Sequence, residues 1–173
     1  MTNETCPGCG VVLPRVDGPV HKYMESTPSC WAAFGEVLTR EYSDATYMSV
    51  HRLTVDAYAV QHPGKPSPQS IQSVAVHLIS LHSVLEQGLS TNAAMSLMQR
   101  CADAMSFTWL EPPASFGGLT VVDVLKADTA TEHHAAVKRW AESTWQAWSP
   151  HHEQIALWAK QARTLAATNP ADS

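Results

Sequence analysis

Three of the four cysteines in this 173-residue chain lie close to its N-terminus, and this placement restricts the fold more than any other feature. Cys6 and Cys9 are separated by two residues, Cys30 follows, and Cys101 stands apart. Two thiolates at this spacing, with a glycine inside the pair and another directly after it, are typical of one half of a tetrahedral zinc site. We therefore expect a zinc knuckle within residues 1–30.

The zinc site needs two further ligands. Cys30 is the obvious third ligand, and His21 is the nearest histidine that completes a set of three thiolates and one imidazole. The spacing between His21 and Cys30 is longer than is usual in zinc fingers, so His62 is the reserve fourth ligand. Four protein ligands leave no position for water or substrate, which predicts a structural zinc ion.

A redox-active or unligated pair of thiols at Cys6 and Cys9 is the alternative to zinc. A redox dithiol normally lies at the N-terminus of a helix within a β-α-β pattern. Residues 10–14 instead predict a short extended stretch that ends at a proline. We therefore favour zinc.

The remainder of the sequence predicts helices separated by proline and glycine. The fold class that we expect is all-α, an antiparallel helical bundle with a small N-terminal zinc knuckle. Residues 1–30 would form the knuckle arm and residues 31–168 the bundle, as one compact unit. Two hairpins, residues 45–87 and 131–167, would supply four antiparallel helices. The expected helices span approximately residues 30–42, 45–61, 70–87, 91–105, 120–127, 131–148 and 150–167.

Charge and hydropathy exclude several classes of protein. Eleven Lys and Arg against sixteen Asp and Glu give a net charge of −5, without the basic balance that phosphate binding needs, so nucleic acid is an unlikely partner. No stretch approaches the ~20 apolar residues of a membrane span. Polar residues follow Met1, where a signal segment would be basic and then apolar. We expect a cytoplasmic protein.

Histidines on the predicted helices define a second candidate site. His51 and His62 share one stripe of the helix expected at 45–61, and His77 lies near the height of His51 on the antiparallel neighbour. Asp56 would orient an imidazole or bind a metal directly. Taken one at a time, such histidines are more often core residues bonded to backbone carbonyls. Together, five residues predict a polar or metal pocket inside the bundle: His51, Asp56, His62, His77 and His151.

Other nucleophiles and histidines carry less information. No Ser or Thr lies in a recognisable nucleophile motif. Cys101 falls in a predicted helix without an evident partner. His133 and His134 are expected to be solvated, because they begin a helix.

Several segments resemble a family of bacterial hypothetical proteins of unknown function. They are residues 6–10 (CPGCG), Cys30-Trp31, residues 50–64 (VHRLTVDAYAVQHPG) and residues 72–78 (QSVAVHL). The resemblance covers most of the chain and implies no activity. It implies that the following residues match motif positions: His51, Asp56, Tyr58, Gln61, His62, Gln72 and His77.

A second, weaker likeness is to DinB-like four-helix bundles, which hold a divalent metal with three histidines and act in thiol-linked transfer or hydrolysis. In this chain no two histidines are four residues apart. The usual metal-binding pair on one helix is therefore missing, and the activity is not carried over.

Two hypotheses of function follow from the sequence. The first is a small cytoplasmic zinc-binding helical protein that binds a protein partner or a small molecule. The alternative is a metal-dependent hydrolase or transferase in which His51, Asp56 and His77 are catalytic and the loop at 107–118 covers the pocket. The number of metal ions per chain separates these hypotheses, and the sequence leaves homo-oligomer formation open.

Overall fold

The computed structural model describes residues 2–168, so that Met1 of the expected arm lies outside the described part. Within these residues a short antiparallel hairpin precedes eight α-helices, which confirms the all-α prediction. The strands are β1 (Asn3–Thr5) and β2 (Val12–Pro14), and the helices are α1 (Pro28–Ser43), α2 (Ala45–Met48), α3 (His51–Gln61), α4 (Pro68–Leu85), α5 (Thr91–Ala104), α6 (Val121–Leu125), α7 (Ala130–Ala147) and α8 (His152–Thr168).

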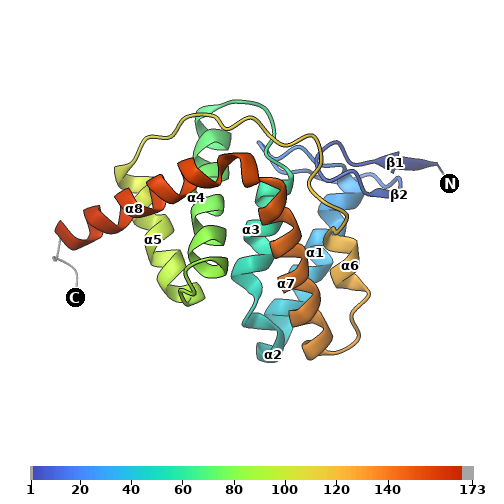
Figure 1. Ribbon diagram of the computed structural model, residues 1–173. Coiled ribbons are helices and arrows are strands. Elements are labelled where there is room, and N and C mark those ends of the chain that lie inside the picture. Colours follow the sequence, from blue (N-terminus) through green and yellow to red (C-terminus); the bar gives the residue numbers. More distant parts are fainter. Residues whose placement is uncertain (1, 169–173) are drawn as a thin grey trace.

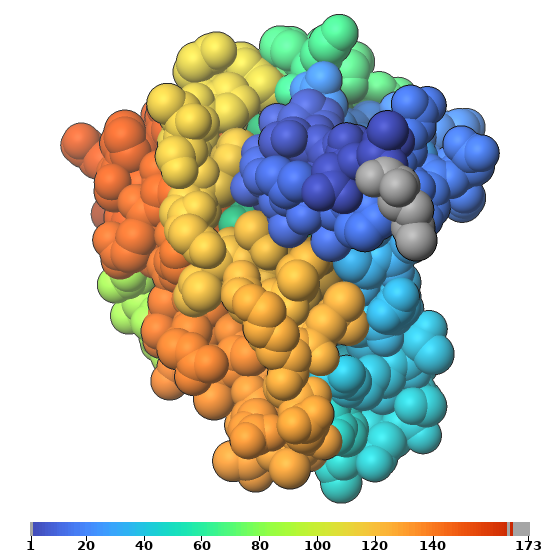
Figure 2. All heavy atoms as spheres, turned by 90° about the vertical axis from the view of Figure 1, so that its right-hand side faces the viewer, coloured from blue at the N-terminus to red at the C-terminus, as the bar shows by residue number. Residues whose placement is uncertain are grey.

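The helices form a bundle in which α3 and α4 are central (Figure 1). These two helices run antiparallel and pack together, as the first predicted hairpin requires; α7 also packs against α3, and α5 against α4. Figure 2 shows the N-terminal hairpin against the segment that leads into α6. No helix among the described residues is long and apolar enough to cross a membrane.

The prediction that residues 131–167 form a second antiparallel helical hairpin is wrong. A turn of 3-10 helix at Ser149–His151 follows α7, and α8 then packs against α4 and α5. The chain turns here because Trp148, just before the 3-10 turn, is anchored in the core. Trp148 is fully buried and its indole Nε1 donates to the carbonyl of Val60 at 3.2 Å, so the chain changes direction where Pro150 begins a new turn.

Capping side chains set several helix ends close to their expected positions. Thr27 caps α1. Asp44 caps α2, which ends at Met48. The single helix predicted at 45–61 is therefore broken, and α3 begins at His51. This break places the His51 side chain beside the end of α1.

A buried amide fixes the long segment between α5 and α6 that Figure 1 shows crossing the molecule. Gln61 is fully buried at the end of α3. Its Nε2 donates to the carbonyls of Phe116 and Leu119, and its Oε1 accepts from the indole of Trp140 on α7 at 2.9 Å. One side chain thus joins α3, α7 and the segment that precedes α6.

Candidate metal centre

Four side chains from distant parts of the sequence converge at one end of the bundle. The sulfurs of Cys6, Cys9 and Cys30 and a ring nitrogen of His62 all lie within 4.8 Å of one another. The Cys9 and Cys30 sulfurs are 3.7 Å apart, and the Cys30 sulfur is 3.4 Å from His62 Nε2. In a tetrahedron with Zn–S bonds of about 2.3 Å and a Zn–N bond of about 2.0 Å, these separations are about 3.8 and about 3.5 Å. The group therefore has the dimensions of a tetrahedral metal site.

Three elements position the four ligands. Cys6 and Cys9 lie in the turn of the hairpin, where the amide of Cys6 donates to the carbonyl of Val11 at 2.8 Å. Cys30 is in the first turn of α1, and its amide donates to the capping hydroxyl of Thr27. His62 is the residue at which α3 ends. A bound ion would consequently join the arm to two helices.

The imidazole of His62 is already oriented for a metal. Its Nδ1 donates to the carbonyl of Tyr58 at 2.7 Å, which leaves the lone pair of Nε2 directed toward Cys30. The Tyr58 ring stacks on the imidazole, with centroids 4.0 Å apart. A carbonyl that fixes the tautomer of a histidine in this way is a common feature of metal sites.

Glycine is required where the ligand loop meets α3. A Cβ at Gly8 would overlap Cδ2 of His62 and lie 2.7 Å from the carbonyl oxygen of Glu25. Gly64, just after His62, has φ of +69°, and a Cβ there would overlap the carbonyl of Tyr23. The absence of side chains at both positions lets the arm approach the end of α3.

The protonation of the three thiols is strongly coupled. Hydrogen bonds from Cys30 and then Cys9 hold the pKa of Cys6 well below its usual range. Hydrogen bonds to Cys6 and Cys9, together with burial, raise the pKa of Cys30. Without a cation the cluster therefore favours one thiolate, and a metal ion is what allows three thiolates to coexist.

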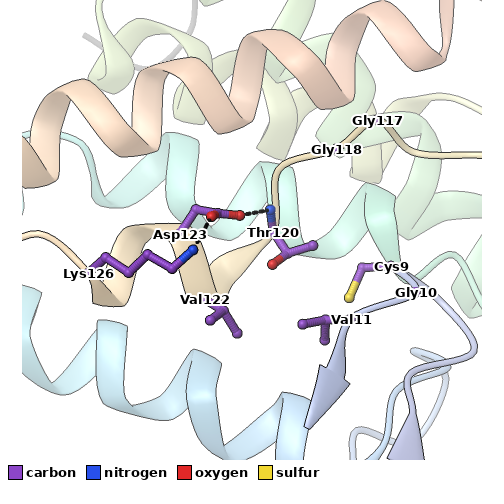
Figure 3. Close-up of a pocket in the computed structure, with 9 residues that line it drawn as sticks. All are labelled: Cys9, Gly10, Val11, Gly117, Gly118, Thr120, Val122, Asp123 and Lys126. Carbon is purple, nitrogen blue, oxygen red and sulfur yellow. Dashed lines mark hydrogen bonds and ion pairs between the residues drawn. The ribbon is translucent and has the colours of Figure 1, made fainter.

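Cys9 is the most accessible of the four side chains. Cys6, Cys30 and His62 are at most 1% exposed, whereas Cys9 is only partly buried. It lines a pocket of about 340 Å³ between the arm and α6. Figure 3 shows its sulfur directed toward the α6 side, where Asp123 accepts hydrogen bonds from the Thr120 amide and from Lys126.

The geometry groups His62, and not His21, with the cysteines. The ring of His21 packs edge-on against Tyr23, with centroids 4.4 Å apart, and against Trp31. Its Nδ1 is buried without a hydrogen-bond partner among the described residues. The first choice of fourth ligand is thus replaced by the reserve, because the end of α3 lies beside the start of α1.

The second predicted pocket is not assembled as expected. Asp56 and His77 do meet, with 2.7 Å between Oδ1 and Nδ1, but His51 bonds to Glu41 instead. His62 belongs to the cysteine group, and His151 donates to the carbonyl of Glu111. Among the described residues, the cysteine group is the one cluster of three or more His, Cys, Asp or Glu residues that could hold a metal.

Sequence reasoning missed Glu41, which is completely buried. Its carboxylate accepts hydrogen bonds from His51, from the hydroxyl of Thr54 at 2.5 Å and from Nε2 of His133 at 2.9 Å. His133, expected to be solvated, is itself fully buried. The signal was present, because position 41 continues the helical stripe of Phe34 and Val37.

The comparisons with known proteins give a family and no activity. Residues 4–149 match the model of a family described as a family of unknown function (DUF5946). This range contains all four members of the cysteine and histidine group. No curated protein and no solved structure matches the chain, so the likeness to DinB-like bundles stays a prediction.

Proposed function

The chain belongs to the DUF5946 family of unknown function, and from that premise we propose that it is a zinc-binding helical protein. In this proposal Cys6, Cys9, Cys30 and His62 hold one structural Zn²⁺, and the helical body binds a small molecule or a protein partner. The observation that carries the proposal is the tetrahedral spacing of three sulfurs and one imidazole nitrogen.

The choice of zinc rests on the donor set. Thiolates and imidazoles suit Zn²⁺, whereas Mg²⁺ and Ca²⁺ are bound through oxygen. Three sulfurs and one nitrogen fill a tetrahedron, so the ion has no open position for substrate. Its role is therefore structural.

The ion would add a fixed attachment to the contacts that already join the arm to the bundle. The hydroxyl of Ser29 on α1 lies within hydrogen-bond distance of both Glu4 and the carbonyl of Pro14, and it accepts from the amide of Val16. Val11, Leu13 and Met24 of the arm pack against the core, but Val12, Val16 and Val20 are 57%, 45% and 48% exposed. Metal coordination would supply much of the free energy that orders the arm.

Metal content per chain tests the proposal. The protein is purified without chelator or immobilised nickel, and zinc is measured by mass spectrometry for wild type, His62→Ala, His21→Ala and Cys101→Ser. We expect one zinc per chain in wild type and in the last two variants. His62→Ala should bind zinc at least about tenfold more weakly. Cys101→Ser is the matched control, since it removes a buried thiol outside the cluster.

Two results would overturn the proposal. Wild-type protein without zinc, and without zinc uptake after reduction of its thiols, would remove its basis. Loss of zinc in His21→Ala with full retention in His62→Ala would overturn the ligand set. Circular dichroism on each variant shows whether a loss of metal reflects the site or a general loss of helix.

The same measurement decides on the alternative of a metal-dependent hydrolase or transferase. That alternative needs a second ion near His51, Asp56 and His77. Two zinc ions per chain, with one lost in His51→Ala, would support it. One zinc that His51→Ala leaves in place would favour the structural role.

A further inference from the structure

Two completely buried carboxylates lie behind the start of α3, and the metal centre uses neither. They belong to Glu41 on α1 and Asp56 on α3. Each is bonded to one of two consecutive side chains in the first turn of α3, Glu41 to His51 and Asp56 to Arg52. Burying a carboxylate is costly, and apolar residues commonly fill such positions at less expense. Paired buried carboxylates that hold partly exposed side chains are therefore typical of binding sites.

Glu41 fixes the orientation of His51. The Nδ1 of His51 donates to the carboxylate at 2.7 Å, while Thr54 and His133 occupy the other oxygen of Glu41. Nε2 is consequently directed outward, where it lies 3.0 Å from the hydroxyl of Tyr42. The His51 side chain is 23% exposed, so this nitrogen is within reach of a ligand.

Asp56 fixes Arg52 in the same way. Its carboxylate accepts from Arg52 Nη2 at 2.7 Å, from His77 Nδ1 at 2.7 Å and from the hydroxyl of Ser80 at 2.6 Å. Nε of Arg52 is buried and has no hydrogen-bond partner among the described residues. The Arg52 side chain is 18% exposed and lines a pocket, and a guanidinium that a carboxylate anchors on one side is suited to bind an oxyanion.

His51 and Arg52 line one pocket of about 530 Å³, formed by the end of α1, α2 and the first turn of α5. This volume lies in the range of small-molecule sites. Tyr42, Met48 and Met95 provide apolar walls and are partly exposed. Among the described residues that line the pocket, none is Asp or Glu. The two buried carboxylates therefore lie behind His51 and Arg52, and these two side chains face the pocket.

We propose that this pocket binds a small monocarboxylic acid with a compact apolar body. The carboxylate lies on the Arg52 guanidinium. The apolar body packs between Met48 and Met95. Because the donors are held by buried carboxylates, the site is ordered before the ligand arrives, which reduces the entropy lost on binding.

Titration of the zinc-loaded full chain with benzoate, followed by amide NMR spectra, tests the proposal. Benzamide is the matched probe, because it has the same shape without the charge. Benzoate should shift amide signals of residues 42–52 and 91–95 with a dissociation constant of about 1 mM. Benzamide should bind at least about tenfold more weakly, since it makes no ion pair.

Substitution of Met95 tests the charge of the pocket without disturbing either buried pair. Met95 is 51% exposed on α5. Met95→Glu places a carboxylate in the pocket and should weaken benzoate binding at least about tenfold by repulsion. Met95→Gln, which is similar in size and neutral, should retain binding within about threefold. Arg52→Gln should abolish benzoate binding, and its circular dichroism shows whether the fold is kept.

Several outcomes would overturn the proposal. The first is the absence of saturable shifts in residues 42–52 and 91–95 up to about 50 mM benzoate. The second is binding of benzamide as tight as that of benzoate. The third is a Met95→Glu variant that binds benzoate as tightly as wild type does. Shifts confined to the arm and α6 would place the carboxylate at the metal centre instead. Zinc content, measured on the same samples, separates a failure here from a failure of the zinc proposal.

Discussion

Gly8 lies against the imidazole of His62, and a side chain there would compete with the ligand for space. We expect Gly8→Ala to weaken zinc binding by about tenfold or more, the range found for residues that support metal ligands. Competition with a chromogenic chelator measures this affinity. Zinc affinity equal to that of wild type would contradict the close approach.

Gly35→Ala is the matched control for that substitution. Gly35 is exposed on α1, and a Cβ there would meet no atom within 4 Å. Alanine favours a helix over glycine, so this variant should gain about 0.5–1 kcal/mol in the free energy of unfolding. Its zinc affinity should not change.

The partial exposure of Cys9 predicts selective chemistry at the metal centre. Iodoacetamide should modify Cys9 before Cys6 or Cys30, because Cys9 lines a pocket whereas Cys6 and Cys30 are completely buried. Cys101 is also completely buried, so it should react after Cys9 as well. Peptide mapping by mass spectrometry gives the order of modification, and initial labelling at Cys6 or Cys30 would be inconsistent with the geometry.

His82 predicts a dependence of stability on pH. Burial, with a smaller contribution from Arg163, lowers its pKa from the ordinary value of 6.5. The unfolded chain then binds the proton more readily than the folded protein, so the free energy of unfolding falls as the pH drops below about 6.5. Urea unfolding between about pH 7 and pH 5 should show a smaller decrease for His82→Gln than for wild type. An identical decrease in the two proteins would exclude His82 as a contributor.

At the scale of elements, α3 connects most of the molecule through its last residue, Gln61, and the C-cap residue His62. His62 reaches the metal centre, and Gln61 joins α7 to the segment before α6. Gln61→Leu would leave the Trp140 indole and two carbonyls without partners. We expect a loss of about 2–4 kcal/mol in the free energy of unfolding, measured with urea.

Gln72→Leu provides the comparison for Gln61→Leu. Its amide also donates to a backbone carbonyl, that of Ala102 at 2.8 Å, but Gln72 is exposed. Water can replace this bond, so the cost should be about 0.5–1 kcal/mol. Equal costs for the two substitutions would show that the Gln61 network adds nothing beyond one ordinary hydrogen bond.

The break between α2 and α3 shows why local sequence signals for helix ends did not predict the pairing of His51 with Glu41. The residues at positions 49 and 50 are Ser and Val, and neither is a helix breaker such as proline or glycine. Local propensity therefore predicts a continuous helix at 45–61. In the folded chain the hydroxyl of Ser49 pairs with Nε2 of His134 on α7 at 3.2 Å. This contact, together with the pairing of His51 and Glu41, joins segments that only packing brings together.

At the scale of the whole molecule, removal of the metal should release the arm from the bundle. Hydrogen exchange with and without a chelator should show loss of protection in residues 2–27, because the contacts that remain there, such as the hairpin and the Ser29 hydrogen bonds, do not replace the metal. Helices α3 to α8 should keep most of their protection, since they pack mainly against one another. Unchanged exchange in the arm would contradict the proposed role of the ion.

The sequence by itself determined the features that depend on neighbouring residues. The pair Cys6 and Cys9 and the helical periodicity are local patterns, and the structure contains both of them. Their geometry is fixed by backbone turns of a few residues, which spacing alone expresses.

Only the tertiary structure decided how distant segments meet. It placed His62 rather than His21 beside the cysteines, buried Glu41 between His51 and His133, and turned α8 away from α7. Each outcome depends on which helix faces bury their apolar surface against one another. That choice is made by the packing of the whole chain, and no spacing within a single segment records it.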